Sequence, residues 1–359
     1  MSLSLLAHAV IPPSGRRHPD EHQLADMLAE LPPGVTREGR AARLPGRDLA
    51  VGRGAASLRV MRLIAGDYTA DVDVLGAALR SLTHGGQNLV VPSGADDPPG
   101  AFRGVVVAPW PNRVVDGRYV FAGVEHQLPT NETARGHALH GFAFDRRWAV
   151  VDESPAEAVL RLDLVPQPGY PFAIQLQAAY TLTDAGLHIA LTARNTGAEP
   201  APYGCTIHPY LTCGTPLVDD AVLVLPADTR VEVDDRMSPT GTRPVETVDC
   251  DFRAGAAIGS RKIDHAFTDL TAGVDGVVTA QLRRPEGSES PGGVQMTWGQ
   301  WARWVQVHTA DRPEPDGDRV GLALEPMSCA ADAFNSGAGL VVLDPGNEHS
   351  AWWGLAAVG

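Results

Sequence analysis

Residues 172–193 read FAIQLQAAYTLTDAGLHIALTA, and this stretch decides the fold class. Apolar side chains occupy every second position from Phe172 to Leu182, and glutamines and a threonine stand among the residues between them. The alternation resumes from Leu187 to Ala193 after the turn sequence Asp-Ala-Gly. Because successive side chains of a strand point to opposite faces, the stretch predicts an antiparallel β-hairpin with one face in the core and one wetter face.

Similar short segments recur from about residue 57 to the C-terminus, separated by turn residues. They are 57–64, 70–75, 104–107, 118–121, 158–165, 221–225, 229–233, 277–282, 303–308 and 339–343. Short strands at this spacing favour an all-β sandwich or barrel, and the sequence has no repeat of the length that marks propellers or solenoids. We therefore expect residues 55–359 to form a single large antiparallel β domain.

The first 54 residues have a different character, with PPSG at 12–15 and PPG at 32–34. A helical pattern of apolar residues at i, i+3, i+4 and i+7 runs from Leu24 to Leu31, where Asp20 can cap its start. We expect residues 1–54 to be a flexible extension with one short helix. His18-Pro19-Asp20-Glu21-His22 fits the HxxEH pattern of some zinc peptidases, but that motif needs a continuous helix and this one contains a proline, so no metal site is expected.

The charge and composition limit the possible partners. The formal net charge is −14, which opposes binding to nucleic acid or to an anionic membrane surface. No apolar run approaches the length of a membrane-spanning helix, and the four cysteines lack metal-site spacing, so buried thiols are expected. The N-terminus has no basic region before its short apolar stretch, which favours a cytoplasmic location. A neutral small molecule is the expected partner, and the chain is expected to be a monomer or a homodimer.

Four sites place a polar or ionisable residue inside an apolar, strand-like segment, where burial is costly unless the group is paired or functional. Three of them contain His140, His208 and Asp264. A lone histidine beside glycine or proline is often structural, and Asp264 could equally be a turn-making residue. The fourth, Glu325, follows the apolar run Val320–Leu324 and precedes a proline. A carboxyl at the end of a buried strand is expected to have its pKa raised by desolvation.

In their order and approximate spacing, these segments and several others resemble the aldose 1-epimerase (galactose mutarotase) family, from about residue 57 to the C-terminus. The motifs are Ala65-Gly66-Asp67-Tyr68, Leu79-Arg80-Ser81-Leu82, Pro111-Asn112-Arg113, Gly117-Arg118-Tyr119, Leu139-His140-Gly141, His208-Pro209-Tyr210-Leu211, Asp264-His265-Ala266-Phe267, Leu324-Glu325-Pro326 and Asp332-Ala333-Phe334-Asn335. No single tripeptide is specific, but the ordered set is. The resemblance implies a large β-sandwich of the galactose mutarotase-like supersandwich type, with the sugar bound in an open cleft.

The resemblance also implies roles for single residues. Glu325 matches the general base and His208 the general acid, while His140, Asp264 and Arg113 match sugar-binding or transition-state residues. Asn112 is a further substrate contact. Interconversion of anomers removes a proton from the anomeric hydroxyl and donates one to the ring oxygen, so two groups must act in opposite senses. Neither step needs a hydride carrier, an electron sink or a Lewis acid, so no cofactor and no metal are expected.

Three other readings remain open at this stage. A glycoside hydrolase would use a pair of carboxylates, for which Glu325 and Asp264 are candidates, but it leaves both histidines without a role. A non-catalytic sugar-binding protein of the same fold is a second alternative. A hexose-6-phosphate 1-epimerase is a third, for which the pair Arg146-Arg147 is the first feature to inspect, although arginines near a turn are usually solvated. Trp110 and Tyr210 are expected to pack in the core rather than against a sugar.

Overall fold

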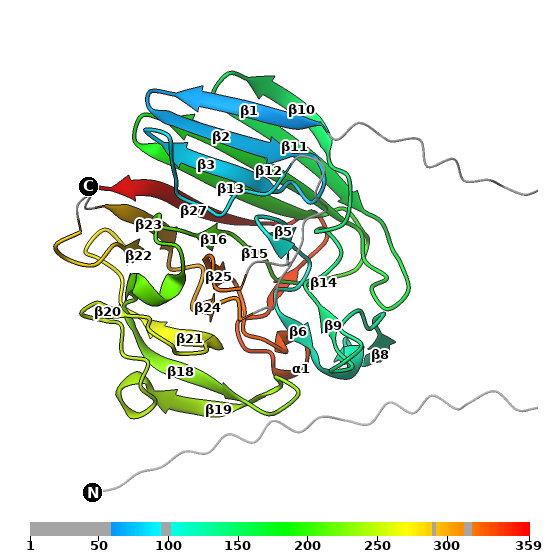
Figure 1. The fold of residues 1–359 in the computed structure, drawn as a ribbon. Helices are drawn as coiled ribbons and strands as arrows, with labels where there is room; N and C mark the ends of the chain where they lie inside the picture. The colour runs from blue at the N-terminus through cyan, green and yellow to red at the C-terminus, as the bar shows by residue number, and fades with distance from the viewer. Residues whose placement is uncertain (1–58, 95–101, 289–291, 312–317) are drawn as a thin grey trace, which may run out of the picture. The chain divides into compact units, whose positions relative to one another are not determined.

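The computed structural model describes residues 59–94, 102–288, 292–311 and 318–359. Figure 1 shows that strands dominate this part of the chain, as the sequence predicts. Helical segments are short: α1 spans Ala333–Ser336, and the 3₁₀ turns η3, η4 and η5 span Val115–Gly117, Val218–Asp220 and Val245–Thr247. The helix expected within residues 20–31 and the HxxEH sequence at 18–22 lie outside the described residues.

The largest sheet has nine strands, and every neighbouring pair in it is antiparallel. In spatial order its strands are β10 (Ala149–Ser154), β11 (Glu157–Leu164), β12 (Ile174–Thr183), β13 (Gly186–Asn195), β27 (Glu348–Val358), β23 (Gly293–Gly299), β22 (Val277–Arg283), β17 (Val222–Val224) and β20 (Ala256–Ala257). The C-terminal strand β27 thus lies in the middle of the sheet, between segments distant in sequence (Figure 1).

A second, six-stranded antiparallel sheet carries several of the candidate site residues. Its strands in order are β16 (Tyr210–Leu211), β25 (Leu322–Met327), β24 (Trp304–His308), β21 (Asp264–Leu270), β18 (Ala227–Val233) and β19 (Pro239–Pro244). Every residue of β25 is buried, which agrees with the apolar run that precedes Glu325 in the sequence. The polar Glu325 is therefore held inside the protein by an otherwise apolar strand.

The remaining strands form smaller sheets around these two. A four-stranded sheet consists of β1 (Val60–Ala65), β2 (Tyr68–Asp73), β3 (Leu79–His84) and β4 (Gln87–Asn88), and it packs on β11 and β12. The two-stranded pairs are β5 (Val106–Val107) with β15 (Thr206–Ile207), β6 (Arg113–Val114) with β9 (Ala138–Leu139), β7 (Arg118–Phe121) with β8 (Val124–Gln127), and β14 (Ala201–Tyr203) with β26 (Val341–Leu343).

The hairpin predicted from residues 172–193 is confirmed as β12 and β13. The two strands pair from Ile174 with Asn195 to Thr183 with Gly186, so Leu182 lies opposite Leu187. Burial alternates along β12, with the apolar set facing inward. Gly186 has a φ of 124°, a conformation that side-chain-bearing residues rarely adopt, which explains the glycine at this turn.

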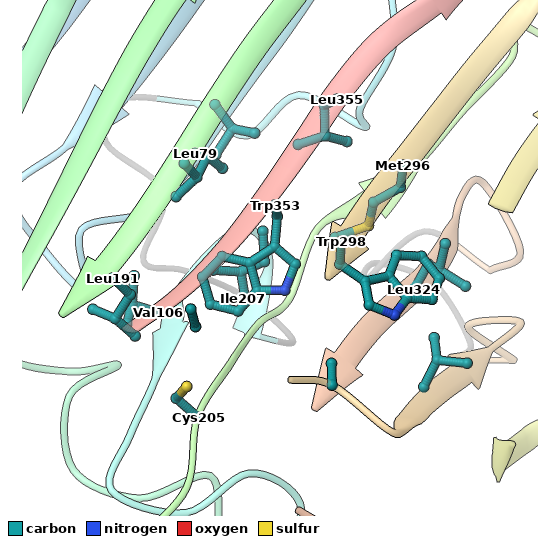
Figure 2. Packing of buried hydrophobic residues seen from close by; sticks show 14 of the residues in the cluster. Leu79, Val106, Leu191, Cys205, Ile207, Met296, Trp298, Leu324, Trp353 and Leu355 are labelled. Carbon is teal, nitrogen blue, oxygen red and sulfur yellow. The ribbon is translucent and has the colours of Figure 1, made fainter. Parts of the chain in front are cut away.

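The core joins the two large sheets. Figure 2 shows Trp298 of β23 beside Leu324 of β25, with Trp353 and Leu355 on β27, the strand that pairs with β23. Both tryptophans are fully buried. The indole Nε1 of Trp353 donates a hydrogen bond of 3.3 Å to the carbonyl oxygen of Pro326, the residue after Glu325. Core packing thus fixes the strand that carries Glu325.

The strand predictions need two kinds of correction. Segment 104–107 contributes only Val106–Val107 to a strand, and segment 339–343 only Val341–Leu343, because Gly104 and Gly339 adopt φ values of 72° in turns. Several strands lie outside the predicted segments, among them β3, β10, β19, β23 and β27. All four cysteines are buried and free, as expected. Within the described residues, no helix is long and apolar enough to cross a membrane.

Candidate active site

All six site residues expected from the sequence line one cavity of about 350 Å³. The loops before and after β5, strand β6, the turn between β8 and β9, and the segments that follow β9 and β15 meet the six-stranded sheet there. The lining residues are Phe102, Asn112, Arg113, Glu132, Arg135, Leu139, His140, His208, Asp264, Gln306, His308, Asp311 and Glu325. Residues separated by more than 200 positions in the chain are thereby brought together.

Glu325 and His208 form the buried centre of this cavity. The Nε2 atom of His208 lies 3.3 Å from Oε1 of Glu325, and the side chains are only 5% and 2% exposed. The backbone of His208 is fixed on both sides, because its N–H donates to Val105 and its carbonyl accepts from Gly104. Its ring also stacks on Tyr210 at a centroid distance of 5.3 Å. An imidazole and a carboxyl held at this distance can exchange or share a proton.

His140 approaches the pair from the turn after β9. Its ring lies 5.2 Å from that of His208, measured between centroids, and 4.7 Å from that of Phe102. The backbone N–H of Asn112 donates to Nδ1 of His140 at 3.3 Å. In the neutral ring the proton is therefore on Nε2, which makes that atom a hydrogen-bond donor. His140 and Asn112 have φ values of 60° and 54°, a left-handed conformation that is costly for such residues and concentrates at functional sites.

Arg113 lies on β6, opposite Leu139 of β9, and its side chain is fixed by Glu132. Its Nε and Nη2 atoms donate to the two oxygens of Glu132 at 2.8 and 2.9 Å, a paired geometry. Arg135 donates to the same carboxylate at 2.7 Å. Burial would raise the pKa of Glu132, but the hydrogen bonds and charges of Arg113 and Arg135 hold this pKa below its ordinary value. Glu132 is therefore an anion between two guanidinium groups.

The strand segment of Arg113 is clamped by Asp332. The backbone N–H of Asp332 donates to the carbonyl of Arg113 at 2.7 Å, and its Oδ1 accepts from the N–H of Val115 at 2.9 Å. Asn335 donates to the same oxygen at 2.7 Å. Burial of Asp332 raises the pKa of its carboxyl despite these hydrogen bonds. This clamp explains why the Asp332–Asn335 segment belongs with the site although it does not line the cavity.

Asp264 lines the cavity from the start of β21. Its Oδ1 accepts a hydrogen bond of 2.7 Å from Nε2 of Gln306 and lies 3.9 Å from Nδ1 of His308. Gln306 faces Glu325 across the β24–β25 pair, so the sheet register places Asp264, Gln306 and Glu325 on neighbouring strands. Asp311 also lines the cavity. Burial would raise its pKa, but hydrogen bonds from Thr309 and Arg319 keep this pKa lowered.

The comparisons with known proteins agree with this architecture. A family model described as aldose 1-epimerase matches residues 59–356. The chain belongs to the aldose 1-epimerase family. The fold of this family member is also seen in the solved GalM/aldose epimerase homologue from C. elegans, with a TM-score of 0.74 at 23% identity, over 84% of this chain and 99% of that chain. The sandwich expected from the resemblance is therefore confirmed.

One relative is the uncharacterized protein YihR of Escherichia coli K12, which is 36% identical to this chain over 298 residues. The match covers 83% of this chain and 92% of YihR. The galactose mutarotase of Mus musculus is 29% identical over 171 residues, or 46% of this chain and 49% of the mouse protein. The crystal structure of galactose 1-epimerase from Lactobacillus acidophilus has a TM-score of 0.70 at 20% identity, over 84% of this chain and 94% of that chain.

Seven lining residues of this aldose 1-epimerase family member were not predicted from the sequence. Gln306 and His308 had a usable signal, because Gln306 interrupts the predicted strand 303–308 between two buried valines, as Glu325 does in its own strand. The other five are Phe102, Glu132, Arg135, Leu139 and Asp311. They lie in turns or at strand ends, where neither alternation nor burial distinguishes them.

The remaining candidates from the sequence are two aromatic residues, the Arg146-Arg147 pair and a possible metal site. Trp110 and Tyr210 are 2% exposed and belong to the core, as expected. Arg146 and Arg147 are exposed on a turn and do not line the cavity. The ligand-type atoms of His140, His208 and Glu325 lie within 4.8 Å of one another, and such groups can bind zinc. Because Asn112 places the His140 proton on Nε2, however, His140 would first have to change tautomer before that atom could bind an ion.

Proposed function

We propose that this family member is an aldose 1-epimerase that interconverts the α and β anomers of a neutral hexose such as galactose or glucose. The observation that carries the proposal is the His208–Glu325 contact of 3.3 Å inside a polar cavity. A buried imidazole and carboxyl side by side supply an acid and a base to one small substrate. No resident cofactor is part of the proposal, because the reaction involves only proton transfers.

In the proposed reaction, the Glu325 carboxylate removes the proton of the anomeric hydroxyl. The electron pair of that O–H bond forms the carbonyl at C1 while the bond from C1 to the ring oxygen breaks. The His208 imidazolium donates its proton to the departing ring oxygen. The free aldehyde then rotates about the C1–C2 bond, and the two proton transfers run in reverse on the other face of the carbonyl. The enzyme returns to its starting protonation state.

The other lining residues would hold the sugar. The Nε2–H of His140 can donate to a sugar oxygen, and Asp264 can accept from hydroxyl groups while Gln306 orients it. Arg113, which also lines the cavity, can donate to sugar oxygens. Asn112 holds Arg113 through its Oδ1, which accepts from the backbone N–H and from Nη1 of Arg113 at 3.0 and 3.3 Å. These roles are proposals that rest on the positions of the side chains in the cavity.

A neutral sugar fits the charges better than a sugar phosphate. The lining residues include four carboxylates, Glu132, Asp264, Asp311 and Glu325, but only two arginines, and both arginines donate to Glu132. A phosphate group would have to compete with the Glu132 carboxylate for both of these arginines. Arg135, whose side chain is 39% exposed, is the lining cation best placed to support the phosphorylated alternative.

The test is polarimetry of freshly dissolved α-galactose and α-glucose, with hexose 6-phosphates and a disaccharide in parallel. We expect enzyme-dependent loss of rotation toward the spontaneous end point, and a pH profile with two limbs, because one group must be protonated and the other ionised. Faster turnover of the phosphorylated sugars would favour the phosphate alternative. Binding without acceleration would favour a non-catalytic sugar-binding protein, and release of monosaccharide from the disaccharide would favour a hydrolase.

A further inference from the structure

Glu132 takes part in no chemical step of the proposed reaction. It nevertheless lines the cavity, and its side chain is only 11% exposed. It is too well paired to act as a base, because its carboxylate accepts three hydrogen bonds from Arg113 and Arg135. We infer that Glu132 is a positioning residue, which fixes the guanidinium of Arg113 so that one edge of it faces the sugar. This inference rests on the proposed function.

The hydrogen bonds that Arg113 makes within the protein determine which of its N–H donors remain for a sugar. A guanidinium has five N–H donors. Among the described residues, three of these donors are taken: Nε and one on Nη2 by Glu132, and one on Nη1 by Asn112. One N–H is left on each terminal nitrogen. These two remaining donors can be offered to hydroxyl oxygens of a sugar.

The turn that carries Glu132 is rigid enough for this task. Its carbonyl accepts from the N–H groups of Arg135 and Gly136, and its own N–H donates to the carbonyl of His137. His137 is fully buried, and its Nδ1 accepts from the N–H of Asp116 at 3.0 Å while its Nε2 contacts the carbonyl of Arg236 at 3.0 Å. The tip of the β18–β19 hairpin therefore contacts the turn through His137 and stabilises it. The fixed Glu132 carboxylate in turn fixes the position of the Arg113 guanidinium.

The test is a double-mutant cycle on Glu132→Gln and Arg113→Lys, measured as kcat/KM and as the Kd for an aldose by calorimetry. A glutamine has nearly the shape of Glu132 but turns a donor toward one N–H of Arg113, so the paired geometry is lost. We expect Glu132→Gln to lower kcat/KM about 10- to 100-fold, the size associated with hydrogen bonds to charged groups. The double variant should lie within about threefold of Arg113→Lys alone, since both changes remove the same interaction.

Glu232→Gln is the matched control, because Glu232 accepts from Nε and Nη2 of Arg230 at 2.9 and 3.1 Å in a similar pair that does not line the cavity. It should leave kcat/KM unchanged. The two limbs of the pH profile should stay in place in Glu132→Gln, because Glu132 does not transfer the proton. If Glu132→Gln fails to fold, Glu132→Asp keeps the charge with a shorter arm and should give an intermediate loss.

Effects of Glu132→Gln and Arg113→Lys that multiply in the double variant would overturn the inference, as would a Glu132→Gln enzyme with the activity of the control. A wild-type protein that turns over no aldose would contradict the proposed function instead. In that case the double-mutant cycle, measured as the Kd for the sugar, still decides the role of Glu132, because the position of Arg113 affects sugar binding even without catalysis.

Discussion

Replacement of Glu325 by glutamine removes the proposed base with very little change of shape. Glu325 is 2% exposed on a fully buried strand, so the amide fills the same volume and creates no cavity. It also leaves no unpaired charge, because His208, at 3.3 Å, can become neutral when the carboxylate is gone. We therefore expect Glu325→Gln to fold, with a Tm within a few degrees of the wild type.

The same change should abolish most of the activity. General acid–base catalysis by one positioned group contributes about 10²- to 10⁴-fold, which corresponds to a barrier increase of about 3–5 kcal/mol when the group is lost. Polarimetry on α-galactose, corrected for spontaneous mutarotation, measures the loss in kcat, and calorimetry checks that the variant still binds the sugar. Glu232→Gln, the same chemical change outside the cavity, should keep wild-type activity.

A Glu325→Gln enzyme that binds sugar normally and retains more than about a tenth of the wild-type kcat would show that Glu325 is not the base, because loss of a general base lowers the rate far more. Such a result would assign the base to another carboxylate of the cavity, of which Asp264 is the first to test.

Three further changes probe the structure around the site. Gly141→Ala should destabilise the fold and disturb the turn of His140, because Gly141 has a φ of 67° and an added Cβ would lie 2.2 Å from the carbonyl oxygen of Ala108; a thermal shift with wild-type Tm and activity would contradict this. Arg80→Met should lower the free energy of unfolding in urea by about 3–5 kcal/mol, because it leaves the fully buried Asp73 carboxylate without its charged partner. A decrease below about 1 kcal/mol, the size of one ordinary hydrogen bond, would show that the Arg80–Asp73 pair does not stabilise the fold. The pKa of the Glu132 carboxyl is lower in the folded than in the unfolded chain, so its stabilising effect is present above its ordinary pKa of 4.5 and is lost as the pH falls through the folded value. The difference in unfolding free energy between wild type and Glu132→Gln should therefore shrink from about pH 6 to about pH 3, and a difference that grows would reverse the assigned sign.

The strands with clear alternation were predictable from the sequence, whereas β27, at the centre of the large sheet, was not. The β12–β13 hairpin shows alternation because its outer face carries Gln175, Gln177 and Thr181. In β27 the apolar set Ala351, Trp353 and Leu355 alternates with residues that include Trp352 and Gly354, so the two faces differ too little to give a period. Its place between β13 and β23 follows from tertiary pairing.

The site was predictable where a polar residue interrupts an apolar strand, as Glu325 does. His208 and His140 gained their assignments from the family resemblance, because the residues alone do not distinguish a catalytic from a structural histidine. Glu132 gave no signal, since an acidic residue in a turn is ordinary and its role depends on Arg113, which lies 19 positions earlier. The distances between the side chains of the cavity depend on how the sheets and loops pack together, so they could not be predicted from the sequence.

Exchange spectroscopy by NMR on an aldose at anomeric equilibrium is the most direct test of the central claim that Glu325 and His208 interconvert anomers. With wild-type protein we predict exchange cross-peaks between the α and β anomeric resonances, an unchanged α to β ratio, and the disappearance of these cross-peaks in Glu325→Gln. Wild-type protein that binds the sugar without producing cross-peaks above the spontaneous rate, across neutral and phosphorylated aldoses, would contradict the claim.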